Sequence, residues 1–394
     1  MPALASIRAR FEREQPLAGL RIAAALHVTP ETANLMIVLQ AGGAELHLAA
    51  ANPLSTQDDI AVALLERYGV AVHARRGADR ATYDGHLDAA LAAGPHLVLD
   101  DGCDLVSRLH TGPSQRLAGV QGGCEQTSTG VVRLRAMAAE QALRFPVLAV
   151  NDSPIQQSFA NRHGTGQSTV DALVRATNVL LAGRTVVVAG FGNCGKGIAD
   201  RARGLGASVV VTEVDPSRAL EAAMSGFRVL PMAQAAAEGD IFVTVTGNRG
   251  VLTEAHFAVM KDHAILANSG HFDLEIDLAW LRAHCVDVRS GVRPQVDEYL
   301  LADGRRLLVL AEGRLVNLAA AEGHPPAVMD VSFAGQALCV EWLAQHAGSL
   351  EPGVYDVPPA IDRGLAELQL AAMGIRIDRL DHEQQTYLTS WRQG

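Results

Sequence analysis

The chain of 394 residues is predicted to form an α/β protein with two doubly wound domains and a short helical C-terminal tail. Short apolar runs alternate with helix-like segments along most of its length, which indicates parallel sheets covered by helices. The length exceeds what one hydrophobic core usually serves. Hydrophobic residues make up 48% of the chain and charged residues 19%, which is typical of a packed globular protein rather than a disordered one.

The first half of the chain contains one series of such elements. Pro30 favours a helix start because the first helical turn does not need its missing N–H, and Gly42 and Gly43 end that helix. The predicted strands are 20–25, 45–50, 70–73, 96–99 and 147–150, and the predicted helices are 30–41, 58–68 and 128–143. Open sheets of this class bind ligands beyond their strand ends, so the polar loops there are candidate sites.

A second series begins near Thr165. The segment TVVVA at 185–189 is short and β-branched, as expected of a fully buried strand. A glycine-rich turn follows it, and then a helix that runs through Leu205. Further strands are predicted at 208–212, 241–245 and 264–267, and residues 360–394 form a mostly helical tail.

Composition narrows the classes of function. The formal charge of −10 argues against a nucleic-acid-binding protein, which needs a basic face. No apolar run approaches the roughly 18 residues of a membrane helix, and the N-terminus lacks the apolar segment of a signal peptide, so we expect a cytoplasmic protein without a membrane anchor. The five scattered cysteines contain no CxxC pair, which indicates neither a metal site nor a disulfide framework. Of the 33 basic residues only Lys196 and Lys261 are lysines.

The glycine-rich turn carries the most specific motif, GxGxxG at 190–195. Gly190 allows a tight turn, Gly192 lets the backbone approach a pyrophosphate, and Gly195 lets the helix pack closely on the strand. The helix N-terminus favours the anion through its free N–H groups and its dipole. Glu213 ends the next strand, where a carboxylate binds the adenosine ribose diol and repels a 2′-phosphate. The sequence therefore predicts a Rossmann domain that binds NAD rather than NADP, and the alternative is a glycine turn in a domain without a dinucleotide.

Other polar loops are less specific when they are read alone. Asp100, Asp101 and Asp104 follow a strand and could act as bases or bind sugar hydroxyls, but aspartates also cap turns there. His27 lies between a strand and a helix, either open to a ligand or as an ordinary turn residue. His271 follows a strand of the second series, which would place it near a nicotinamide.

Three further positions stay ambiguous. The segment Thr127-Ser128-Thr129 precedes a helix and is by default its N-cap. His324 has no role that its spacing alone defines. Cys194, inside the glycine turn, is a packing residue rather than a reactive one.

Together these loops resemble the S-adenosylhomocysteine hydrolase (adenosylhomocysteinase) family over nearly the whole chain. The matching segments include ALHVTPETANL at 25–35, NPLSTQDD at 52–59, DDGCD at 100–104, GGCEQTSTGVVRLRAM at 122–137, NRHGTGQSTVDA at 161–172, VVVAGFGNCGKG at 186–197, NSGHFDLEID at 268–277 and GHPPAVMDVSF at 323–333. The resemblance implies that tightly held NAD oxidises the 3′-hydroxyl of a 5′-substituted adenosine to a ketone. The ketone acidifies the C4′ proton, a 5′ thiol leaves, water adds, and the ketone is reduced again.

The resemblance also implies site residues. Thr29 and Glu31 would hold the adenine, with His324 close to it. His27 and Asp101 would handle protons near C4′ and C5′, and His271 would act beside the nicotinamide. The implied cofactor contacts are Thr127, Ser128, Thr129, Asn161, Gly190, Gly192, Asn193, Cys194, Gly195, Glu213, Arg218, Asn248, Ser269, Gly270, His271 and Asn317.

The domain bounds follow from the same resemblance. A nucleoside-binding domain would comprise 1–164 and 325–358, the NAD domain 165–324, and an oligomerisation tail 359–394. The tail is similar to that of the shorter archaeal and bacterial members, and it lacks the segment by which longer members cover a neighbour's cofactor. We expect a homo-oligomer, at least a dimer and by resemblance a tetramer.

The match fails at the positions that act on the sugar. Gln156 stands where the family has a lysine, Ala160 where it has an aspartate, and Gln126 where it has a glutamate, although Gln126 and Gln156 would still contact the substrate. Glutamine cannot take a proton at neutral pH, and general-base assistance is worth ~10²–10⁴-fold, so ordinary hydrolysis should be severely impaired. His163 is the nearest alternative base in the sequence, or a surface turn residue. Ala51 replaces a cysteine that family members often carry.

Three hypotheses follow. The chain could be an enzyme of this family whose substrate, sugar position or nucleophile has changed. It could be an ordinary adenosylhomocysteinase with low activity. It could also be a catalytically silent NAD- and nucleoside-binding paralogue that regulates a partner. The intact glycine turn slightly favours the first, because decay would also erode the cofactor loop.

Overall fold

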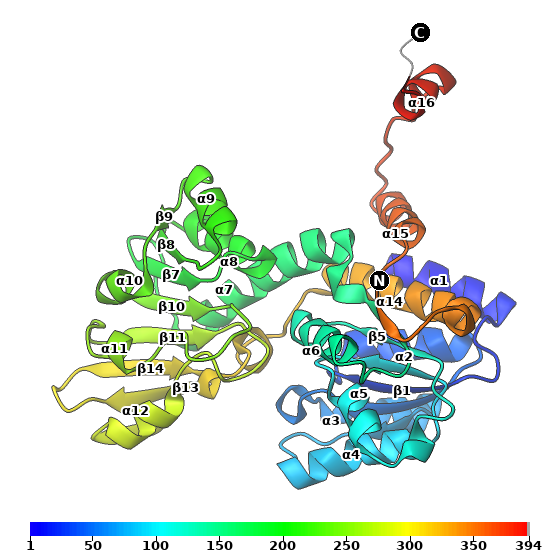
Figure 1. Ribbon diagram of the computed structural model, residues 1–394. Coiled ribbons are helices and arrows are strands. Elements are labelled where there is room, and N and C mark those ends of the chain that lie inside the picture. The colour runs from blue at the N-terminus through cyan, green and yellow to red at the C-terminus, as the bar shows by residue number, and fades with distance from the viewer. Residues whose placement is uncertain (392–394) are drawn as a thin grey trace.

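The computed structural model describes residues 1–391, which form two α/β domains side by side (Figure 1). The first domain contains a seven-stranded parallel sheet, sheet A, of order β15-β6-β5-β4-β1-β2-β3. Its strands are β1 (Arg21–Leu26), β2 (Glu45–Ala50), β3 (Ala71–His73), β4 (Leu97–Asp100), β5 (Gly122–Glu125), β6 (Pro146–Ala149) and β15 (Gly353–Asp356). The α/β prediction is confirmed for this half.

The second domain contains an eight-stranded sheet, sheet B, of order β12-β13-β14-β11-β10-β7-β8-β9. Strands β14, β11, β10, β8 and β9 run parallel to β7, as expected. The strand β13 pairs antiparallel with both β14 and β12, and this antiparallel extension was not predicted. The strands are β7 (Thr185–Ala189), β8 (Ser208–Thr212), β9 (Arg228–Val229), β10 (Ile241–Thr244), β11 (Ala264–Asn268), β12 (Asp287–Arg293), β13 (Val296–Leu300) and β14 (Arg306–Leu310).

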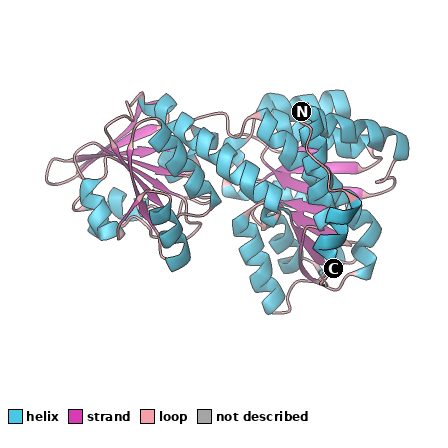
Figure 2. Cartoon of the chain, turned by 90° about the horizontal axis from the view of Figure 1, so that it is seen from above, coloured by secondary structure: helices cyan, strands magenta, loops and turns pink. Residues whose placement is uncertain are grey.

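Helices cover both faces of each sheet (Figure 2). In the first domain one face carries α1 (Pro2–Glu14), α2 (Pro30–Ala41), α3 (Asp58–Tyr68) and α14 (Pro326–His346), and the other carries α4 (Arg80–Ala92), α5 (Asp104–Thr111) and α6 (Ser128–Ala139). In the second domain α7 (Thr165–Thr177), α8 (Asn193–Gly204) and α9 (Pro216–Met224) oppose α10 (Met232–Glu238), α11 (Glu254–Phe257) and α12 (Leu278–His284). The short α13 (Val316–Ala319) precedes the return to the first domain.

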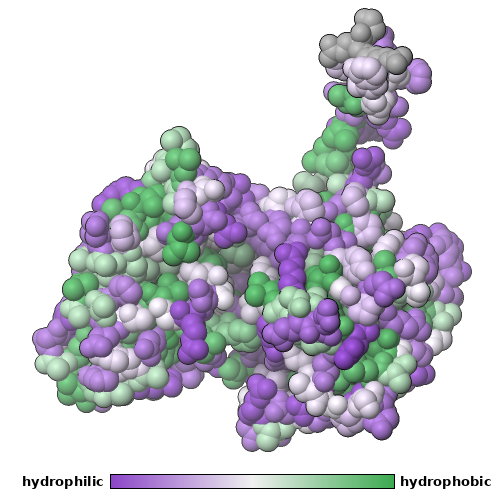
Figure 3. Space-filling view, in the orientation of Figure 1, coloured by the Kyte–Doolittle hydropathy of each residue, from purple (hydrophilic) through white to green (hydrophobic). Residues whose placement is uncertain are grey.

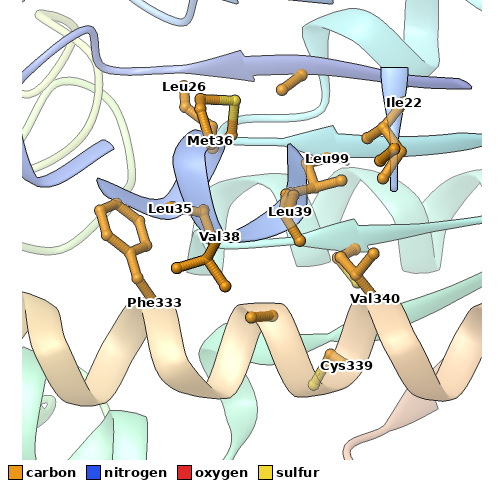
Figure 4. Packing of buried hydrophobic residues seen from close by; sticks show 14 of the residues in the cluster. Ile22, Leu26, Leu35, Met36, Val38, Leu39, Leu99, Phe333, Cys339 and Val340 are labelled. Carbon is orange, nitrogen blue, oxygen red and sulfur yellow. The ribbon is translucent and has the colours of Figure 1, made fainter. Parts of the chain in front are cut away.

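The helix α14 is the central core helix of the first domain. Its Phe333 and Val340 face Leu35 and Leu39 of α2, and this layer packs on the sheet (Figure 4). Within the described residues, the segment Pro326–Ser349 is the one stretch long and apolar enough to span a membrane by length and composition, and the sequence analysis overlooked it. Because 67% of that stretch is buried inside the fold, its hydrophobicity is that of a core helix.

A long helix connects the two domains, and its first part is not α-helical. Residues Gln156–Gly164 form a π-helical segment that continues into α7. Gly197 of α8 packs so tightly against it that an added Cβ would lie 1.8 Å from the carbonyl oxygen of Arg162. π-helical insertions are rare and frequently accompany functional sites. This segment contains both Gln156 and Ala160.

Several element ends differ from prediction. The helix α6 ends at Ala139 instead of 143, because Gln141 adopts a left-handed backbone conformation (φ 56°) that an α-helix cannot continue. The strand β15 and the helix α1 were not predicted. The tail forms α15 (Pro359–Ala372) and α16 (His382–Thr389), which projects from the body of the first domain in Figure 1. Residues 392–394 of the predicted tail lie outside the described residues.

Candidate active site

A cleft of about 1130 Å³ lies between the two domains, at the carboxyl ends of strands from both sheets. The space-filling view shows the hollow between the two halves (Figure 3). All the residues predicted for the site line this cleft except Gly195, which lies beneath the glycine turn. Residues from distant parts of the sequence therefore meet in one place, as the rule for open α/β sheets predicts.

The glycine turn has the geometry that a close backbone approach requires. Gly190 has a φ of 104°, and an added Cβ would lie 3.0 Å from the carbonyl oxygen of Val245. At Gly195 a Cβ would lie 2.0 Å from the carbonyl oxygen of Gly190. Gly192 is the N-cap of α8, and no protein atom other than the end of Arg218 lies within 4 Å of its missing Cβ. The N–H groups of the first turn of α8 are thereby left open to an anion.

Two polar groups on the same wall are oriented toward a ligand. Backbone N–H groups of Phe191 and Val214, each 2.7 Å away, fix the two oxygens of the Glu213 carboxylate at the end of β8. Asn317 donates its amide to Ser168 Oγ at 3.1 Å, which leaves its Oδ1 buried without a partner in the described residues. Buried acceptors are normally paired, so Asn317 Oδ1 indicates a missing donor from a ligand.

His27, at the end of β1, is held as a neutral base. Its Nδ1 lies 2.5 Å from Ser55 Oγ, and Ser55 donates its own proton to the carbonyl of Asn52. The Ser55 oxygen therefore accepts from Nδ1–H, which leaves Nε2 without a proton. Burial lowers the pKa of His27 to about 4, so the imidazole is uncharged at neutral pH.

Asp101 lies close to two of the histidines that line the cleft, His27 and His271. His27 Nε2 lies 3.6 Å from Asp101 Oδ2, and the rings of His27 and His271 are 6.4 Å apart. Burial raises the pKa of Asp101, and burial lowers the pKa of His271 against the opposing effect of the Asp101 charge. Asp101 Oδ1 is buried and has no partner among the described residues. The three groups can exchange protons with a ligand placed between them.

A pair of buried carboxyl groups, Asp100 and Glu125, lies next to Asp101 in the fold. Asp100 and Glu125 are register partners at the ends of β4 and β5, and both are buried. Asp100 accepts from the N–H groups of Asp101 and Val106, so it is a structural cap, which was one of its two predicted roles. Burial raises the pKa of Asp100 to about 7, and burial together with the Asp100 charge raises that of Glu125.

The residues predicted to contact a base also line the cleft. Thr29 is the N-cap of α2, and Glu31 lies in the first turn of that helix and lines the cleft. His324 Nε2 lies 3.0 Å from Thr165 Oγ1, and burial lowers the pKa of His324 to about 4. A neutral imidazole at this position can donate or accept one hydrogen bond.

The three departures from the family pattern differ in their environments. Gln126 donates to Ser332 Oγ at 2.6 Å, so its Oε1 is buried without a partner in the described part of the chain. Gln156 is buried in the cleft wall. Its backbone N–H donates to Ser153 Oγ at 3.2 Å, whereas its side-chain amide has no hydrogen-bond partner within residues 1–391. Ala160 is fully buried behind that wall and does not line the cleft.

Other candidate groups lie elsewhere. His163 is exposed and lies outside the cleft, where its ring contacts Phe159. Of its two interpretations, alternative base or surface residue, this position corresponds to the second. Lys196 lines the cleft but pairs with Glu221 at 2.7 Å. Cys194 is only partly exposed, and burial raises the pKa of its thiol. No cluster of three His, Cys, Asp or Glu suited to a metal occurs in residues 1–391.

Sequence reasoning missed residues that act through others. Ser55 sets the tautomer of His27, Ser332 orients Gln126, and Gln157 accepts from the side chain of Asn193. A serine or glutamine in a polar loop has no signal that separates it from a solvated residue. Glu125 does have such a signal in the sequence, because it ends an otherwise apolar strand, and a buried carboxylate at that position needs a specific partner.

A dinucleotide-binding turn beside a proton-exchanging group that both domains supply, in one cleft, defines a two-domain dinucleotide-dependent enzyme. The chain belongs to the S-adenosyl-L-homocysteine hydrolase family. The family model described as "S-adenosyl-L-homocysteine hydrolase" matches residues 1–121, and its "NAD binding domain" matches residues 161–323.

Individual relatives agree with this assignment. The adenosylhomocysteinase of Thermosynechococcus vestitus is 56% identical over 394 residues, covering 100% of this chain and 92% of that protein. An S-inosyl-L-homocysteine hydrolase of Methanopyrus kandleri is 52% identical, covering 100% and 93%. Among solved structures, the dipicolinate synthase A chain of Bacillus subtilis has a TM-score of 0.47 at 13% identity, covering 84% of this chain and 98% of that one.

NAD is the cofactor of this family, and the residues here fit it. The open first turn of α8 suits the pyrophosphate, Glu213 suits a ribose diol, and the unpartnered Asn317 Oδ1 suits a donor from the ligand. The cofactor predicted from the glycine motif is thus supported by both the geometry and the relatives.

Proposed function

We propose that this chain is an NAD-dependent enzyme that acts on adenosine or a 5′-substituted adenosine through a 3′-keto sugar, with a substrate or reaction altered from that of ordinary adenosylhomocysteinases. One observation carries the proposal. The group formed by His27, Asp101 and His271 is assembled in the cleft, while the neutral Gln156 occupies the wall where the family pattern has a lysine.

The chain's own residues divide the chemistry. Bound NAD supplies an oxidation of the sugar and its reversal. The neutral Nε2 of His27 and the Asp101 carboxyl move protons at C4′ and C5′, where the low pKa of His27 keeps a lone pair available at neutral pH. Thr29, Glu31 and His324 bind the base, and Asn161, Asn248, Ser269 and Gly270 contact the cofactor.

The altered step is the removal of the 3′ proton. The Gln156 amide can donate a hydrogen bond to a ketone or accept one from a hydroxyl, but it cannot hold the proton that a lysine would take. Ala160 adds no polar group. This wall can therefore bind the sugar, but it has no general base for the removal of the 3′ proton.

The test is an absorbance scan at 340 nm of NAD-loaded protein mixed with a panel of adenosine derivatives. The panel includes a hypoxanthine nucleoside, because one relative is named an S-inosyl-L-homocysteine hydrolase. We expect a stable or transient signal with at least one nucleoside, and its loss in His27→Asn if the signal depends on proton transfer. Measurable nucleoside binding with no signal from any member would instead identify a silent paralogue.

We also propose that the protein is a homo-oligomer in the cytoplasm. The tail leaves apolar side chains exposed, among them Met373 (57% exposed) and Ile377 (67%) between α15 and α16, and Leu388 (69%) in α16. Exposed apolar surface of this kind is typical of interfaces. Light scattering after size exclusion would contradict the proposal if it gave the 41.6 kDa mass of one chain.

A further inference from the structure

The turn that carries Asp101 is strained. Gly102 has a φ of 116°, and Cys103 has a φ of 65°, which is unusual for a residue with a side chain. Backbone conformations of this kind persist only where the surroundings hold them in place. The turn also touches the other domain, because a Cβ added to Gly102 would lie 2.8 Å from His271 Nε2.

Two side chains hold this turn from opposite sides. Glu125 Oε1 accepts the N–H of Gly102 at 2.9 Å, and the Arg133 guanidinium donates to the Gly102 carbonyl. Arg133 also binds Asp104 Oδ1 at 2.7 Å, one residue beyond the strained pair. Both backbone polar groups of Gly102, its N–H and its carbonyl, are therefore fixed by side chains rather than by a sheet or a helix.

Glu125 also fixes the neighbouring loop. The same Oε1 accepts the N–H and the hydroxyl of Thr127, each at 2.9 Å, and Thr127 is the N-cap of α6. Space for this carboxyl exists only because Gly130 has no side chain, since a Cβ there would lie 2.1 Å from the Glu125 carboxyl carbon. One carboxyl oxygen thus connects the loop of Asp101 to the loop of Gln126.

We propose that Glu125 and Arg133 form a clamp that positions Asp101 between His27 and His271 and sets the contact of Gly102 with His271. Both are positioning residues, because neither lines the cleft. The inference rests on the proposed roles of Asp101 and His271. It adds that the strained turn keeps its shape through these two side chains.

Two variants of Glu125 distinguish the hydrogen bonds that it accepts from the effect of its negative charge. Burial and the neighbouring Asp100 raise the pKa of Glu125, so its neutral form is favoured. Glutamine has nearly the same shape, keeps an acceptor at Oε1 and places an amide beside Asp100, where Oε2 has no partner among the described residues. Glu125→Gln should therefore retain the clamp, and Glu125→Ala should lose it.

The first readout needs no substrate. Titration of the histidine resonances of NAD-loaded protein reports the pKa of His271, which Asp101 and Asp104 raise and which His27 and Arg133 lower. Glu125 does not line the cleft but holds the turn of Asp101, so a change in Glu125→Ala reports movement of Asp101. We expect a lower His271 pKa in Glu125→Ala and the wild-type value in Glu125→Gln. This result is independent of whether any nucleoside reacts.

The second readout is the rate of the nucleoside-dependent signal at 340 nm. A misplacement of about 1 Å can cost about 10²-fold, which is the slowing expected for Glu125→Ala at unchanged nucleoside binding. Arg133→Met, at a partly exposed site that should fold, should slow the rate about tenfold or more, while Glu140→Gln and Arg144→Met serve as exposed controls. Unchanged titration in Glu125→Ala, an unchanged rate in Arg133→Met, or equal damage from Glu125→Gln and Glu125→Ala would overturn the proposal.

Discussion

The two walls of the cleft are built in different ways. On the cofactor wall the backbone itself forms the surface, and glycines make room for it at Gly190, Gly192 and Gly195. On the nucleoside wall, side chains such as the buried Glu125 and the partly exposed Ser55 hold the reactive groups in place. Cofactor binding at the first wall should therefore be lost when an atom is added to a glycine. The positions of the reactive side chains on the second wall should be lost when a hydrogen bond is removed.

The largest effect should come from adding one carbon to the cofactor wall. In Gly195→Ala the new Cβ would lie 2.0 Å from the carbonyl oxygen of Gly190, so the turn must open and NAD affinity should fall by more than about 100-fold. Gly204→Ala, in the same helix, meets no atom within 4 Å and is the matched control. NAD released from the two denatured proteins is compared by absorbance. Equal NAD content would refute this account of the wall.

A smaller effect is expected when the Glu213 carboxylate is removed from the cofactor wall. Hydrogen bonds to a charged group contribute about 1.5–3 kcal/mol, so Glu213→Ala should weaken NAD binding about 10–100-fold. It should also narrow the preference for NAD over NADP, since the carboxylate no longer repels a 2′-phosphate. Calorimetry with both dinucleotides measures this, with Glu254→Ala as a control on the same domain. An unchanged preference would remove Glu213 from the cofactor site.

The smallest effect concerns pH and the nucleoside wall. His324 has a pKa of about 4 in the folded protein against 6.5 in the unfolded chain. Between those values the unfolded state binds more protons, so this group lowers stability as the pH falls from about 6.5 to 4, by at most about 3 kcal/mol. Asp100, with its pKa raised to about 7, acts in the opposite direction.

The difference between the wild type and His324→Asn isolates this contribution. Melting temperatures of the two proteins should diverge between pH 7 and 5, with the variant losing less stability on acidification. Parallel curves would mean that His324 has the same pKa in the folded and the unfolded protein, which would contradict its burial as a neutral group.

The same contrast explains what the sequence could reveal. Glycines and strand ends have a fixed spacing, so the cofactor wall, β7 and β8 were predicted with their bounds. The π-helical segment at Gln156–Gly164, the β12–β13 extension and the clamp at Glu125 depend on contacts between residues far apart in the chain. Propensity does not encode such contacts. The departures at Gln156 and Ala160 were visible only because the family pattern gave them a reference.

The central claim is that these departures redirect the chemistry, and thiol release from S-adenosylhomocysteine tests it most directly. The wild type, Gln156→Lys with Ala160→Asp, and the 56% identical relative from Thermosynechococcus vestitus are assayed side by side. The account predicts weak or absent release by the wild type and a clear gain in the double variant, within the ~10²–10⁴-fold that a general base supplies. Release by the wild type at the rate of the relative would contradict it.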